Sequence, residues 1–166
     1  MDSSTYLAGV AELYAAEILG EALATRWLDL ASDPDEKYKL SLFLQLESEA
    51  KVRLRPLLAR HGIPLVEDET LRSDGAAAAT EFASRPWTEA MATLAELALP
   101  YAQRFQALVD VAPPEDVPLV MFMVDHEQSV MRMAEREAAG ESVMDRELLV
   151  MLSYPIPRAA QPQQST

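Results

Sequence analysis

The sequence has no cysteine, and only two histidines and five glycines among its 166 residues. The absence of cysteine excludes disulfide bonds, thiolate catalysis and zinc or iron–sulfur sites held by cysteine. A Ser-His-Asp site would have to use His61 or His126, and the spacing of the sequence recommends neither. The sequence also has no glycine-rich phosphate loop, no nucleophile elbow and no HExxH. These absences leave few of the common catalytic sites open.

Basic residues are scarce as well: 14 Lys and Arg stand against 27 Asp and Glu, which gives a formal net charge of −13. This balance argues against nucleic-acid and anionic-membrane partners, because both attract clustered Lys and Arg. No apolar run approaches the roughly 18–20 residues that a membrane-spanning helix needs, and the first residues do not resemble a signal peptide. These features predict a soluble, cytoplasmic protein.

What the sequence does contain favours helices: 49% of its residues are hydrophobic, and Ala, Leu, Glu and Arg are abundant. Four long segments show helical periodicity and are separated by Gly, Pro and Asp. Asp33 and Gly62 are predicted to cap the second of these helices at its two ends. The predicted helices run from about Thr5 to Ala31, Pro34 to His61, Pro86 to the Ala112-Pro113 boundary, and Glu115 or Pro118 to Ala139.

The lengths of the connections predict the topology. The links between the first two helices and between the last two are short, so each pair should be antiparallel. Residues 62–85 are long enough to cross the length of a helix, and their AAAATEFAS portion can form a short helix. A short amphipathic helix is expected within residues 145–154, so we predict one domain over residues 1–154 and a disordered tail over residues 155–166.

Three carboxylates are predicted to face the interior of this bundle. At about 100° per residue, Glu17 falls within the apolar face of the first helix, Glu47 lies beside that of the second, and Glu127 lies near the centre of that of the last. His126 falls at the margin of that last face, and Asp125 points to solvent. Carboxylates and an imidazole at such positions can bind one metal ion.

The helix lengths, the crossover and these acids resemble the ferritin-like superfamily, which includes the rubrerythrins. That family places Glu on the first and third long helices and Glu-x-x-His on the second and fourth. Here the matching segments are Glu47-Ser-Glu-Ala50 and Glu127-Gln-Ser-Val130, both without the histidine, and Leu97 stands where a carboxylate is expected. The resemblance implies an all-α, ferritin-like four-helix bundle with one long crossover and a short C-terminal helix, present as a homodimer. It also implies a site for iron or manganese that has lost about half of its ligands and retains Glu17, Glu47, Glu127 and, as an added candidate, His126.

Two functions follow from these residues. In the first, the chain is a non-catalytic scaffold or binding protein, and the acids pair with cations such as Lys51, four residues after Glu47. In the second, it is a metal-binding oxidoreductase with a reduced, carboxylate-rich site. The methionines of the last long helix have three alternative roles: core filling, an oligomer contact at Met121, or a pocket for a small hydrophobic ligand.

Overall fold

The computed structural model describes residues 3–156 and 158, which form six helices and, within those residues, no strand. The four long helices predicted from the sequence are present, with ends within a few residues of those expected. The helices are α1 Ser3–Leu30, α2 Pro34–Arg60, α3 Glu69–Ala83, α4 Trp87–Val109, α5 Val117–Ala138 and α6 Met144–Leu149.

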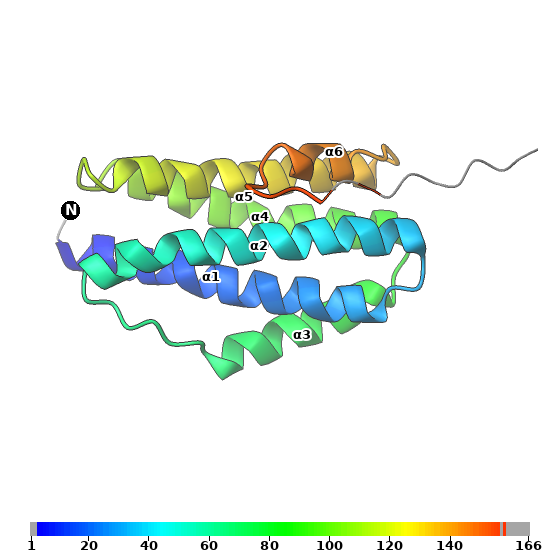
Figure 1. Ribbon diagram of the computed structural model, residues 1–166, viewed down its shortest axis with the longest axis horizontal. Coiled ribbons are helices and arrows are strands. Elements are labelled where there is room, and N and C mark those ends of the chain that lie inside the picture. Colours follow the sequence, from blue (N-terminus) through cyan, green and yellow to red (C-terminus); the bar gives the residue numbers. More distant parts are fainter. Residues whose placement is uncertain (1–2, 157, 159–166) are drawn as a thin grey trace, which may run out of the picture.

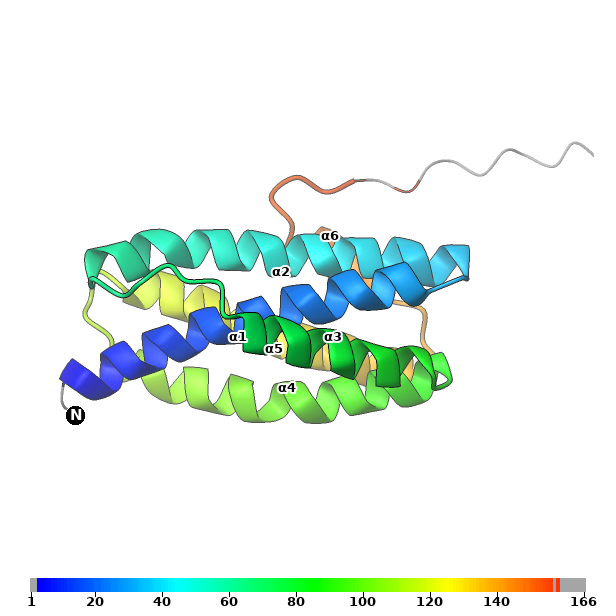
Figure 2. The ribbon, with the colours of Figure 1, turned by 90° about the horizontal axis from the view of Figure 1, so that it is seen from below.

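The four long helices lie side by side, and α1 and α2 form one antiparallel pair while α4 and α5 form another (Figure 1). The connection from α2 to α4 runs back along the length of the molecule, and its second part is α3, which packs along α1 (Figures 1 and 2). The short helix α6 lies against α2 and α5. None of the helices in the described part of the chain is long and apolar enough to span a bilayer.

Local sequence signals set the ends of α2 and α5. The Asp33 carboxylate accepts hydrogen bonds from the backbone N–H groups of Asp35, at 2.8 Å, and Glu36, at 3.0 Å, as expected of an N-cap. Gly62 after α2 and Gly140 after α5 have φ of +67° and +84°, the left-handed conformation in which glycine commonly ends a helix. The predicted capping residues of α2 are therefore confirmed.

The crossover helix α3 is longer than the short helix predicted from AAAATEFAS, because it begins at Glu69. Asp68 caps it by accepting a hydrogen bond from Thr70 N at 2.8 Å. Gly75, in the middle of α3, lets the two backbones approach closely: a Cβ here would lie 3.1 Å from Leu23 N and would also overlap the Leu19 carbonyl oxygen of α1. The sequence predicts a short helix that begins only after Gly75, whereas in the structure Gly75 lies within α3 and packs against α1.

A buried carboxylate joins the ends of three helices. Asp116, just before α5, accepts hydrogen bonds from Tyr6 of α1 at 2.8 Å and from Arg60, and lies 2.6 Å from His61 Nε2. Burial alone would raise the pKa of Asp116, but these bonds and the nearby positive charges lower it below its usual range. This contact gives His61 a structural role at the end of α2.

The interior contains two apolar clusters. One is built around Trp27, Phe43 and Met91, and the other around Leu13, Leu54 and Phe105. Their buried members come from all four long helices. Acidic and imidazole side chains occupy the interior between these two clusters, and they form the site described below.

The methionines of the last long helix differ in burial. Met123 and Met133 are fully buried, whereas Met121 is 37% exposed. Most of the predicted tail lies outside the described residues. Ile156, which is described, lies beside α2, where its carbonyl accepts a hydrogen bond from Tyr38 Oη at 3.0 Å, and Arg158 pairs with Asp35.

Candidate metal centre

Three side chains from three helices converge in the interior: Glu17 of α1, Glu47 of α2 and His126 of α5. His126 Nε2 lies 3.4 Å from Glu47 Oε1 and 3.7 Å from Glu17 Oε1, and one donor atom from each residue lies within 4.8 Å of the others. All three side chains are buried, with Glu17 and His126 1% exposed and Glu47 5% exposed. Within the described part of the chain this is the single group of three such donors.

The separations between these donors suit a metal ion. Donor atoms about 2.1 Å from one ion lie about 3.0 Å apart at octahedral angles and about 3.4 Å apart at tetrahedral angles. The two distances to His126 Nε2 are close to these values, so small side-chain shifts would place the three atoms around one ion. Glu17 Oε2 and His126 Nδ1 are buried without a hydrogen-bond partner, and such atoms are costly unless a ligand or a proton compensates them.

A glycine makes room for one of the candidate ligands. Gly20 lies one turn after Glu17 on α1, and the Glu47 carboxylate packs against its Cα. A Cβ at position 20 would lie 2.9 Å from Glu47 Cδ and closer still to Oε2. No sequence signal marked Gly20, because the close approach depends on how α1 and α2 pack.

The cluster has more carboxylates than positively charged groups. Burial, reinforced by the negative charges of Glu47 and Glu127, raises the pKa of Glu17 well above its usual value, although His126 opposes this. Burial alone would lower the pKa of His126, but Glu17 and Glu47 outweigh it and raise that pKa to about 10. Burial likewise raises the pKa of Glu127 to about 7. One imidazolium cannot neutralise three carboxylates, so the cluster must retain protons or bind a cation.

Lys51 does not supply that cation. Its i+4 spacing predicted a pair with Glu47, but its ammonium group contacts Glu21 and lies 3.0 Å from Glu67 Oε1. Glu67 follows α2 in the crossover, and the helical periodicity that placed Lys51 near Glu47 gave no sign of it. The predicted pairing with Glu47 was therefore wrong, and Lys51 does not neutralise that acid.

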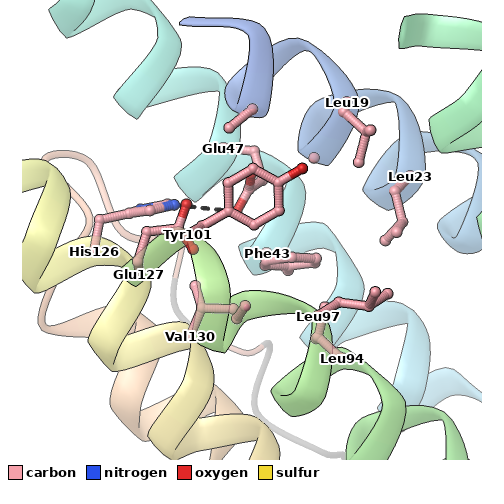
Figure 3. A pocket seen from close by; sticks show the side chains of 13 residues that line it. Leu19, Leu23, Phe43, Glu47, Leu94, Leu97, Tyr101, His126, Glu127 and Val130 are labelled. Carbon is pink, nitrogen blue, oxygen red and sulfur yellow. Dashed lines mark ion pairs between the residues drawn. The ribbon is translucent and has the colours of Figure 1, made fainter. Parts of the chain in front are cut away.

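The other predicted residues lie around the three donors. Glu127 is buried, 8% exposed, and lines the same pocket as Glu47 and His126, but it is not one of the three converging donors (Figure 3). Asp125 is exposed, as predicted. Leu94 and Leu97 of α4 also line the pocket, so α4 contributes apolar side chains to this region (Figure 3).

The residues that would complete Glu-x-x-His are Ala50 and Val130, and both are buried in the apolar clusters. Neither offers a donor atom, and neither does Leu94 or Leu97. The donors that converge are thus enough for one ion. Comparisons with protein-family models, with curated proteins and with solved structures found no match for this chain.

Proposed function

We propose that this chain is a ferritin-like helical bundle that binds a single iron or manganese ion through Glu17, Glu47 and His126. The observation that carries the proposal is the convergence of three buried donor atoms from three helices within 4.8 Å. Carboxylate and imidazole donors without thiolate suit Fe²⁺ and Mn²⁺. The antiparallel pairs and the long crossover support the ferritin-like arrangement.

The geometry favours this function over the scaffold hypothesis. A scaffold would neutralise its buried acids with cations of the chain, but here one imidazole faces three carboxylates and Lys51 contacts other acids. A metal ion held by three protein atoms retains coordination positions for water or a small ligand. The three residues would hold the ion from three helices, and the apolar side chains around them would limit its contact with bulk water.

Metal content tests the proposal directly. Protein stripped with a chelator, reconstituted anaerobically with Fe²⁺ or Mn²⁺ and desalted is expected to retain about one ion per chain by elemental analysis. The near-isosteric Glu17→Gln and Glu47→Gln variants should lose it, because each removes an anionic ligand and preserves the packing.

Asp125→Asn is the matched control, since it removes an exposed acid next to His126, and it should bind metal like the wild type. Circular dichroism would confirm that every variant is folded. A wild type that retains no ion, or a Glu47→Gln variant that retains it fully, contradicts the proposal.

Gly20→Ala offers a test that leaves every ligand in place. The new methyl group would overlap the Glu47 carboxylate and force that flexible side chain to another rotamer. We expect the metal dissociation constant to rise about tenfold or more, because a metal site tolerates little displacement of a ligand. Helical content should be unchanged, since alanine favours a helix over glycine by about 1 kcal/mol.

Gly9→Ala is the control for this variant. It makes the same substitution in the same helix, but its methyl group would meet the side chain of Leu108, with Cδ1 at 2.6 Å, and not the site. Competition titrations with a metal indicator should give Gly9→Ala the wild-type dissociation constant. Equal effects of the two substitutions would show that Gly20 acts through α1 as a whole and not through Glu47.

A further inference from the structure

An apolar pocket lies beside the three donors. Its walls come from all four long helices and include Leu19 and Leu23 of α1, Phe43 of α2, Leu97 of α4 and Val130 of α5 (Figure 3). The pocket has a volume of about 80 Å³. Leu97 is 49% exposed, so the pocket reaches the surface beside this side chain. Concave apolar sites with a few convergent polar groups are the usual binding sites for small molecules.

One polar group of this pocket has no hydrogen-bond partner among the described residues. Glu127 is 8% exposed and lines the pocket, and among the described residues its carboxylate makes neither a hydrogen bond nor an ion pair. Figure 3 shows its carboxylate turned into the space bounded by Tyr101 and Val130. A carboxylate removed from water needs a hydrogen-bond donor. No donor among the described residues bonds to it, so a ligand in the pocket can supply one in place of water.

We propose that the pocket binds a small, uncharged apolar molecule with a single hydrogen-bond donor, such as an alcohol, and that the donor bonds to Glu127. The apolar body would lie against Leu23, Phe43 and Leu97. The neighbouring acids Glu17 and Glu47 disfavour anions at the same place. This inference goes beyond metal binding and assigns Glu127 to the organic ligand, whereas the metal is assigned to Glu17, Glu47 and His126.

Two isomers test whether binding depends on the hydrogen-bond donor of the ligand. 1-Butanol and diethyl ether have the same atoms, but the alcohol alone has an O–H to donate. Each is titrated into metal-free protein in a chelator, and the saturable shifts of methyl signals are followed by nuclear magnetic resonance. We expect 1-butanol to bind about tenfold more tightly than the ether, and butanoate not to bind.

Glu127→Leu should remove that preference. The substitution deletes the acceptor and keeps a side chain of similar size, so the dissociation constant of 1-butanol should rise about tenfold and that of diethyl ether should stay within about twofold. An unchanged preference for the alcohol would overturn the role of Glu127. Equal binding of butanoate and 1-butanol would overturn the proposed ligand class.

Leu97→Trp and Leu99→Trp locate the binding site. Both leucines lie on α4 and are similarly exposed, at 49% and 44%, but only Leu97 is among the pocket residues. A tryptophan at position 97 should obstruct the pocket and abolish binding of both isomers, and one at position 99 should change neither. Loss of binding in both variants, or in neither, would show that the molecules bind elsewhere on the surface.

The metal content of Glu127→Leu separates this inference from the proposed function. With Glu127 on the organic ligand, the variant should retain about one ion per chain. If it loses the ion, Glu127 is a metal ligand and the present assignment fails. If the wild type binds 1-butanol but no metal, the proposed function fails and the pocket assignment stands.

Discussion

Glu137→Ala is expected to lower the free energy of unfolding by about 3–5 kcal/mol, the usual cost of leaving a buried ion without its partner. Glu137 of α5 is 2% exposed and accepts hydrogen bonds from Lys39 Nζ at 2.9 Å and from Trp87 Nε1 at 2.8 Å. Its other oxygen accepts from the backbone N–H groups of Val143 and Met144, each at 2.7 Å, where α6 begins. One carboxylate thus links α2, α4, α5 and α6.

The loss would be large because Lys39 is itself buried, 5% exposed. Without Glu137 its ammonium group would retain Asp35, at 3.3 Å on the surface side, as its one ion-pair partner among the described residues. Urea denaturation measures the change, and the melting temperature should fall by roughly 10 °C. Glu135→Ala removes an exposed acid from the same helix and should change the free energy of unfolding by about 0.5 kcal/mol or less. A loss equally small for Glu137→Ala would mean that water replaces its four hydrogen bonds.

The sequence predicted the long helices because their signals are local. Capping residues, glycines in the left-handed conformation and apolar periodicity act within one or two turns, and the residues around Asp33 and Gly62 show each of them. The start of α3 was missed because Asp68 stands in an acidic run and Gly75 resembles a loop residue. The contact of Gly75 with α1 overrides its low helix propensity, and a single sequence does not show that contact.

The candidate site was predictable only in part, because local sequence signals do not show contacts between helices. Helical periodicity gives the direction of a side chain, and it placed Glu17, Glu47 and Glu127 inside and Asp125 outside, as the structure does. It does not give the partner of a side chain. Lys51 was therefore paired with the wrong acid, and nothing indicated the long-range partner of Glu137.

Glu17→Met is expected to raise the free energy of unfolding of the metal-free protein by about 1–4 kcal/mol. Glu17 is buried with an unpartnered oxygen, beside a second carboxylate and a single imidazole. Methionine has a similar shape and no charge, and its replacement of Glu17 would remove one acid and keep Glu47 beside His126, 3.4 Å away. Urea denaturation in a chelator, with wild type and variant side by side, gives the difference.

The gain should depend on pH. Burial raises the pKa of Glu17 above its usual value, so the folded chain holds a proton that the unfolded chain releases near its ordinary pKa of about 4.3. Stability is therefore lost as pH rises above that value, and the advantage of Glu17→Met should be small near pH 4 and larger near pH 8. Glu12→Met is the control: Glu12 pairs with Arg104 at 2.7 Å on the surface, and its loss should cost less than about 1 kcal/mol at either pH.

Metal should offset this difference in stability. An ion that binds only the folded chain stabilises the wild type by about 2.7 kcal/mol at a free concentration one hundred times its dissociation constant, and a variant without the site gains nothing. Glu17→Met should therefore be the more stable protein in a chelator and lose that advantage with Fe²⁺ or Mn²⁺. If Glu17→Met instead destabilises the metal-free chain, Glu17 holds the helices together by itself. Packing alone would favour an apolar side chain at position 17. If Glu17 destabilises the metal-free protein and stabilises the metal-bound one, metal binding explains why a buried acid is present there.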